Sequence, residues 1–144
     1  MELFWLWLHL LAAAFWLGGL LMLAIVTVSA LRLLDRPTFR ALIRRVGRVF
    51  LLGSLIAWAI LALSGLALAG GRIHTLGDLT ATGFGRTLLL KTGLFGLAIV
   101  LTLVHTVAGG RSSPVAVRLS RTLSPVIFLL TLAIFYLAVR LTAS

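Results

Sequence analysis

The sequence lacks cysteine altogether, and it has only three acidic residues and three prolines among 144 residues. Charged residues make up 11% and apolar residues 61%, against about 25% and about 45–50% in an average soluble domain. The absence of cysteine excludes a disulfide scaffold and a cysteine-ligated zinc module. The shortage of charge leaves too little polar surface for a soluble Rossmann-type enzyme or a disordered tail, and the composition therefore predicts an integral membrane protein.

The scarcity of carboxylates also limits the chemistry that the chain can perform. Its acidic residues are Glu2, Asp35 and Asp78, so no carboxylate pair is available for acid and base catalysis. No nucleophile elbow, Walker loop, dinucleotide fingerprint or HExxH motif is present. The sequence therefore favours a protein that is not an enzyme.

Long uncharged runs predict the architecture. They cover residues 3–31, 49–71 and 122–139, and a fourth run over 87–110 is interrupted only by Lys91. Each is close to or longer than the roughly 18–20 residues that a helix needs to cross about 30 Å of hydrocarbon, and their continuity is unlike the alternating strands of a porin-like barrel. We expect an all-α integral membrane protein, a four-transmembrane-helix bundle forming a single domain over 1–144. The expected helices cover about 3–33, 38–70, 86–109 and 116–141, and the first is expected to be retained rather than cleaved as a signal peptide.

The basic residues predict an orientation. Of the thirteen lysines and arginines, which give a net charge of +10, nine fall in the first and third connections. The positive-inside rule places these connections in the cytoplasm and both termini outside (N-out/C-out). The nine residues are Arg32, Arg36, Arg40, Arg44, Arg45, Arg48, Arg111, Arg118 and Arg121.

Four arginines recur at every fourth position in an amphipathic cytoplasmic lead-in over 36–48, which opens with Asp35 and Pro37, residues typical of a helix start. A row of guanidinium groups beside an apolar face suits the anionic lipid headgroups of the inner leaflet, and we expect no nucleic acid partner. The four arginines are Arg36, Arg40, Arg44 and Arg48.

Three ionisable side chains lie inside the predicted spans, where each costs about 2.5–3.5 kcal/mol to insert. His9 and Lys91 lie about 9 Å and 6 Å below the outer ends of their helices, and His105 lies about 21 Å further along the helix of Lys91. His9 and Lys91 therefore both lie in the outer half of the bilayer, where Trp16, on the helix face of His9, and Tyr136 are further candidates for a cofactor site. The alternatives are interhelical packing for His9, a snorkelling Lys91 and a structural contact for His105.

His74, in the outer loop, is the third imidazole of the chain. The candidate metal ligands are thus His9, His74 and His105, although His74 also suits a solvated loop position. The glycines between residues 80 and 86 are expected to permit tight turns in that loop.

Two segments resemble a known family. The run from His9 to Gly19, a histidine followed by small residues and Trp-Leu-Gly-Gly, is similar to the opening motif of the CopD (copper resistance D) family, and the run from Thr82 to Lys91 is similar to its second motif. The Ser64-Gly65 pair is similar too. The related HemJ-type protoporphyrinogen oxidases have an early-helix histidine and a lysine opening the third helix, so the resemblance implies a link to copper or to haem b at His9 and Lys91.

Three functions follow from these observations. Copper handling or transport would use His9 and His74 as an outer site and His105 as a release site, because imidazole suits copper. A haem b redox protein would use His9 as an axial ligand and Lys91 as a second ligand or a propionate partner. The third alternative is a cofactor-free accessory subunit, as a homo-oligomer or within a larger membrane complex.

Overall fold

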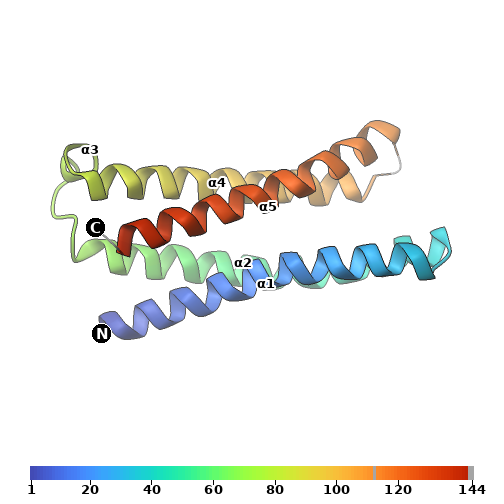
Figure 1. The fold of residues 1–144 in the computed structure, drawn as a ribbon, viewed down its shortest axis with the longest axis horizontal. Helices are drawn as coiled ribbons and strands as arrows, with labels where there is room; N and C mark the ends of the chain where they lie inside the picture. Colours follow the sequence, from blue (N-terminus) through green and yellow to red (C-terminus); the bar gives the residue numbers. More distant parts are fainter. Residues whose placement is uncertain (112, 143–144) are drawn as a thin grey trace. The chain divides into compact units, whose positions relative to one another are not determined.

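The computed structural model describes residues 1–111 and 113–142, the last two by their backbone alone. Within these residues the chain forms five helices (Figure 1): α1 (Glu2–Leu33), α2 (Arg36–Gly70), α3 (Asp78–Ala81), α4 (Gly83–Gly109) and α5 (Pro114–Thr142). The four long helices were predicted, and each begins one to three residues earlier than expected; the short α3 was not predicted. Each long helix contains a stretch long and apolar enough to cross a membrane.

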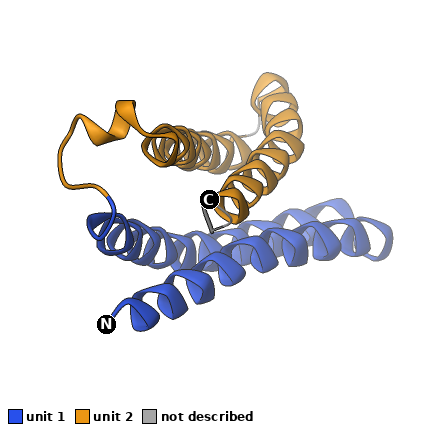
Figure 2. Ribbon diagram, turned by 60° about the vertical axis from the view of Figure 1, so that its left-hand side comes forward, with its two compact units in different colours: residues 1–72 blue, residues 73–144 orange. Residues whose placement is uncertain are grey.

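The helices group into two compact units, coloured separately in Figure 2. Unit 1 covers Met1–Arg72 and is a hairpin in which α1 packs along α2. Unit 2 begins at Ile73 and is a hairpin of α4 and α5, with α3 packed on α4. We call the end of each hairpin at its interhelical connection the closed end and the other the open end. The predicted assembly of all four helices into one bundle stays a prediction.

Asp35 and Pro37 start α2 as the sequence predicted. The backbone N–H of Thr38 donates to the Asp35 carboxylate at 3.3 Å, and Pro37 occupies the first turn, where its missing N–H costs nothing. The basic segment then continues without a break into the apolar span, in one helix of 35 residues, about 52 Å long. The lead-in over 36–48 is therefore the first part of α2 and not a separate helix.

Aromatic rings that pack against glycines of the opposite helix join the two helices of unit 1. The rings of Phe15 and Phe50 stack with centroids 6.3 Å apart. Phe50 of α2 lies against Gly19 of α1, where a Cβ atom would overlap its ring, and Phe15 of α1 lies against Gly53 of α2, where a Cβ would fall 2.7 Å from the Phe15 Cζ. Each glycine thus makes the space that the phenylalanine of the opposite helix fills.

Two tryptophans complete this interface. Trp16 of α1 and Trp58 of α2 meet edge to face, with centroids 6.0 Å apart and planes at 90°, an arrangement that the ring quadrupoles favour. Both are buried, Trp16 at 1% and Trp58 at 4% exposure. The other buried apolar residues of the unit are Ala12, Ala13, Ala30, Ala57 and Leu61.

The core of unit 2 uses small and β-branched side chains instead. Thr102 and Thr131 are buried, and their hydroxyls donate to the carbonyls of Ala98 at 2.7 Å and Ile127 at 2.8 Å, one turn earlier. Each hydroxyl is therefore satisfied within its own helix, which lets threonine pack like valine in an apolar interface. No aromatic side chain is buried in the described part of this unit.

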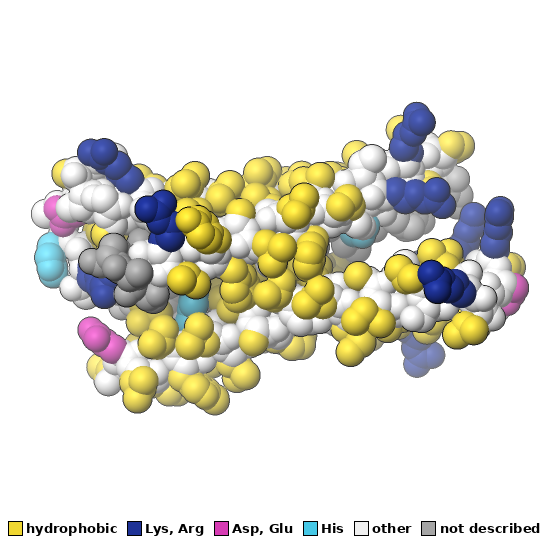
Figure 3. Space-filling view, in the orientation of Figure 1, with side chains coloured by type: hydrophobic (Ala, Val, Ile, Leu, Met, Phe, Trp, Pro, Cys, Tyr) yellow, Lys and Arg dark blue, Asp and Glu magenta, His cyan; other side chains and the backbone are white. Residues whose placement is uncertain are grey.

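The outer surfaces of both hairpins suit lipid. Large apolar side chains stay exposed along the helices, including Leu55, Leu66 and Leu129. In Figure 3 such side chains cover the middle of the long helices, while lysine and arginine gather toward the helix ends. A water-soluble monomer rarely exposes this much apolar surface, but a spanning helix must.

Candidate functional site

His9 is anchored to the opposite helix of its own hairpin. Its Nδ1 lies 2.8 Å from the Ser64 Oγ on α2, about 10 Å from the open end of unit 1. Gly65 lies beside the ring, where a Cβ would meet the His9 Cε1 at an ordinary 3.7 Å. The structure therefore brings together two of the segments that carry the family resemblance, the early histidine and the Ser64-Gly65 pair.

The hydrogen bonds of Ser64 determine the tautomer of His9. The Ser64 hydroxyl donates its one proton to the Ile60 carbonyl, with the two oxygens 2.6 Å apart. Its Oγ can then only accept from the His9 Nδ1, so the neutral ring carries its proton on Nδ1 and its lone pair on Nε2. A metal-binding histidine needs this arrangement, in which one ring nitrogen is held by an acceptor and the other presents a lone pair.

His105 is held in the same way at the closed end of unit 2. Its Nδ1 lies 3.0 Å from the backbone carbonyl oxygen of Ser120 on α5, and the Ser120 hydroxyl lies 3.2 Å from the same nitrogen. A carbonyl can only accept, so Nδ1 carries the proton and Nε2 again has the lone pair. This contact with the neighbouring helix is the structural role that the sequence left open for His105, and it is compatible with ligand binding through Nε2.

The other predicted cofactor residues lie in different surroundings. Trp16 is buried against Trp58 in unit 1, and Tyr136 of α5 is 64% exposed. Lys91 of α4 is half-buried, and its ammonium has no hydrogen bond or ion pair within the described residues. Because His9 and Lys91 belong to different units, their pairing in one site stays a prediction.

His74 precedes α3 in an exposed loop whose backbone is fixed by Asp78. The Asp78 carboxylate accepts from the backbone N–H groups of Thr75 at 2.8 Å and His74 at 2.9 Å. These two hydrogen bonds lower the pKa of the Asp78 carboxyl below its ordinary value, that from Thr75 more strongly. His74 lies at the α3 end of α4, and His105 lies about 33 Å from that end, so the structure does not bring these two imidazoles together.

The motif around Gly85 acts in packing and capping. The Thr82 hydroxyl caps α4 by accepting from the Gly85 N–H at 2.9 Å, and the Arg86 Nε donates to the Thr80 carbonyl at 2.8 Å. A Cβ on Gly85 would overlap the backbone of Asp78 and Leu79, so only glycine lets α3 pack this closely on α4.

The expectation of tight glycine turns between residues 80 and 86 was therefore wrong. Gly83 and Gly85 lie inside the first turn of α4, and no glycine in the described residues has a positive φ. Glycine is needed at position 85, but the reason is the close approach of the α3 backbone and not the geometry of a turn.

Two polar side chains of α2 are buried, Ser54 at 0% and Trp58 at 4% exposure. Ser54 Oγ and Trp58 Nε1 have no hydrogen-bond partner within the described residues, and they lie one turn apart on the buried face of the helix. Such groups are rare in native cores. They are available to an internal water or to a polar ligand, and burial together with helical spacing is the signal that finds them.

No group of three or more histidine, cysteine, aspartate or glutamate side chains that could hold a metal ion lies within the described part of the chain. His9 of unit 1 and His105 of unit 2 are thus not part of such a group within the described residues. A single imidazole is a weak metal ligand, which suits transient contact with an ion more than storage.

The fold is that of a multi-pass membrane protein made of helical hairpins. The chain is 30% identical over 145 residues to an uncharacterised protein of Aquifex aeolicus (strain VF5), covering 97% of this chain and 94% of that protein, and it belongs to the same family.

A second relative has a stated function. Over 98 residues the chain is 32% identical to the copper transport protein CutJ of Bacillus subtilis (strain 168), which covers 68% of this chain but only 17% of that protein. The similarity thus concerns a small part of a much longer chain. No protein-family model matches the sequence, and no solved structure is similar to it.

Proposed function

We propose that the protein handles copper at the bacterial inner membrane and passes the ion across it, as the CopD resemblance implies. The observation that carries this proposal is the hydrogen bond from the His9 Nδ1 to Ser64, which orients the ring and assigns its lone pair to Nε2. The similarity to a copper transport protein over two thirds of the chain supports it.

In this proposal copper is the cargo, and each anchored histidine is a place where the ion pauses. The Nε2 atoms of His9 and His105 donate to copper, and the serine contacts on Nδ1 keep each ring oriented. The open end of unit 1 faces outward and the arginine-rich closed ends face the cytoplasm, by the positive-inside rule. His74, exposed in the outer loop, lies on the outer side. Single-imidazole contacts release the ion readily, as transport requires.

Copper uptake into proteoliposomes tests this proposal. We expect His9→Ala to abolish saturable uptake and Ser64→Ala to weaken copper binding about tenfold, as removal of a ligand's hydrogen-bond partner does in other metal sites. Trp7→Ala, which changes an exposed side chain on the same helix, is the matched control and should leave uptake unchanged. Copper binding and uptake that persist unaltered in His9→Ala would refute the role of His9.

A haem b protein is the second candidate, and the observation in its favour is Lys91. A half-buried ammonium without a partner in the described residues suits a propionate, and a neutral histidine held at Nδ1 suits an axial ligand. Haem iron bound there would supply one-electron transfer, while His9 would orient the group and Lys91 would balance its charge.

An absorption spectrum separates these candidates. Protein purified after expression with ample haem should show a Soret band that His9→Ala removes if the chain binds haem b. A colourless protein that binds copper leaves the first proposal in place. A colourless protein that binds no copper points to the cofactor-free accessory subunit.

A further inference from the structure

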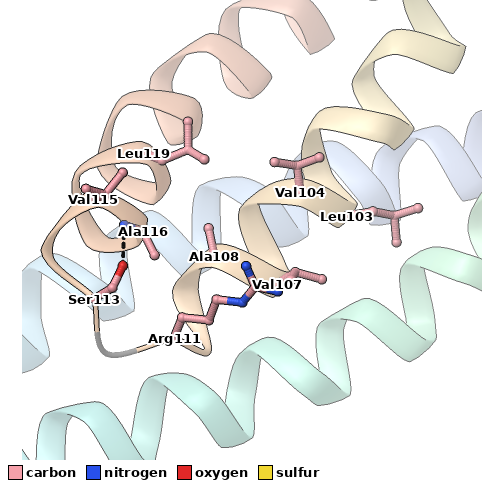
Figure 4. Close-up of a pocket in the computed structure, with 9 residues that line it drawn as sticks. All are labelled: Leu103, Val104, Val107, Ala108, Arg111, Ser113, Val115, Ala116 and Leu119. Atoms are coloured by element: carbon pink, nitrogen blue, oxygen red, sulfur yellow. Dashed lines mark hydrogen bonds between the residues drawn. The ribbon is translucent and has the colours of Figure 1, made fainter.

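A groove separate from the histidines lies at the closed end of unit 2, between the last turns of α4 and the first turns of α5 (Figure 4). It is an open groove of about 430 Å³, a volume in the range of small-molecule sites. Its walls are apolar side chains from both helices, among them Leu103, Val107 and Leu119. The proposed function makes no use of this groove.

One cation lies at the end of the groove. Arg111 lies two residues beyond Gly109, the last residue of α4, and Figure 4 shows its side chain reaching back toward Val107. Its guanidinium has no acceptor within the described residues. The other polar side chain of the lining, Ser113, accepts from the Ala116 N–H at 3.1 Å and so caps α5. Arg111 is therefore the group that is available to a ligand.

The charges near the closed end of unit 2 favour an anionic ligand. The acidic residue that unit 2 contains, Asp78, lies beyond the opposite end of α4 and is bound to backbone N–H groups there. The neighbouring ionisable side chains on α5 are Arg118 and Arg121, both exposed and both positive. No carboxylate of this unit can neutralise Arg111, whereas a phosphate can do so through two parallel hydrogen bonds.

We propose that this groove holds one anionic phospholipid, with an acyl chain along the apolar walls and the phosphate on Arg111. The position fits, because α4 ends at Gly109 and α5 begins at Pro114, so Arg111 lies where the helices leave the hydrocarbon. Free phosphate would leave the apolar walls without a partner, and an uncharged lipid would leave the guanidinium without one. A phospholipid with a net negative headgroup satisfies both.

Native mass spectrometry of the full chain in detergent, titrated separately with phosphatidylglycerol and phosphatidylcholine, tests the site. We expect one phosphatidylglycerol to stay bound with about fivefold preference, the contribution of about one basic residue at a membrane surface. Arg111→Gln should remove this preference. Arg118→Gln removes an exposed arginine at the same end that does not line the groove, and it should preserve the preference.

Two further measurements complete the test. Inorganic phosphate in excess should not displace the lipid, because the acyl chain shares the binding; full displacement would overturn the lipid assignment in favour of a phosphate site. Val107→Phe enlarges an exposed side chain of the lining, so it should fill the groove and lower retention of phosphatidylglycerol while helical circular dichroism stays unchanged. Equal retention of both lipids by the unaltered chain, or equal effects of Arg111→Gln and Arg118→Gln, would also overturn the proposal.

Discussion

The two hairpins of this protein hold their helices together with different side chains. Apolar burial does not drive helices together in lipid, so packing and polar contacts must. Unit 1 inserts phenylalanine rings into glycine gaps and adds an edge-to-face tryptophan pair. Unit 2 brings its helices together on alanine and threonine, with the hydroxyls bonded inside each helix. The stability of unit 1 should therefore be lowered most by removing one large side chain. The stability of unit 2 should be lowered most by adding one.

The hairpins nevertheless share one kind of polar contact, a hydrogen bond between a histidine and a serine. In each, an imidazole Nδ1 bonds to a serine of the paired helix, at the open end in unit 1 and at the closed end in unit 2. The acceptor differs, because His9 uses a side-chain oxygen and His105 uses chiefly a backbone carbonyl. A substitution can remove the side-chain acceptor of His9 but not the backbone acceptor of His105, and this difference can be tested.

The largest effect is expected in the aromatic interface of unit 1. Trp58→Ala removes a ring that is 4% exposed and leaves a cavity beside Trp16, so we expect a loss of about 3 kcal/mol of unfolding free energy in detergent. Trp7→Ala, on a side chain that is 59% exposed, should change the free energy by much less. Equal losses in denaturant titrations of the two variants would show that the tryptophan pair does not stabilise the hairpin.

The second effect concerns close approach in unit 2. Gly85→Ala places a methyl group against the backbone of α3, and we expect a cost of about 1–3 kcal/mol with earlier proteolysis of the loop over 73–82. Gly83→Ala, two residues earlier, has no atom within 4 Å of the new Cβ and is the matched control. If both variants resist protease like the unaltered chain, α3 does not pack as described.

The third effect separates the two histidine anchors. Ser64→Ala removes the acceptor of the His9 Nδ1–H, at a cost of about 1 kcal/mol, and should change the tautomer populations of His9. Ser120→Ala keeps the carbonyl contact to His105 and should leave its tautomer unchanged. Nitrogen-15 NMR of the imidazoles measures both. A change at His105 as large as that at His9 would show that the Ser120 hydroxyl, not its carbonyl, holds the ring.

The smallest effect is a pH dependence in the connections. Hydrogen bonds lower the pKa of Asp35, chiefly from Thr38, and that of Asp78, chiefly from Thr75. A lowered pKa means that these contacts are fully present above the ordinary pKa of aspartate and are lost as pH falls through the lowered value. We expect the amide NMR chemical shifts of Thr38 and Thr75 to change as the pH is lowered. The Thr38 shift should stay constant in Asp35→Asn, and the Thr75 shift should stay constant in Asp78→Asn. Signals that still titrate in these variants would point to another group.

The sequence predicted the long helices well because a membrane imposes a simple length rule. Uncharged runs of the required length located four helices to within three residues at their starts, and Asp35 with Pro37 predicted the start of α2. The short α3 escaped because its residues, Asp78–Ala81, carry no periodic pattern. The glycines that follow it were taken for turns because a sequence does not show which backbone approaches them.

The candidate site divides in the same way. Composition by itself determined that the chain spans a membrane and that His9, Lys91 and His105 are the costly side chains within it, because charge and length decide insertion. Only the tertiary structure decided that Ser64 and Ser120 hold the two histidines, that Trp16 meets Trp58 and that a groove ends at Arg111. These contacts join residues on different helices, and the rotation of each helix about its axis is set by packing, which no single span encodes.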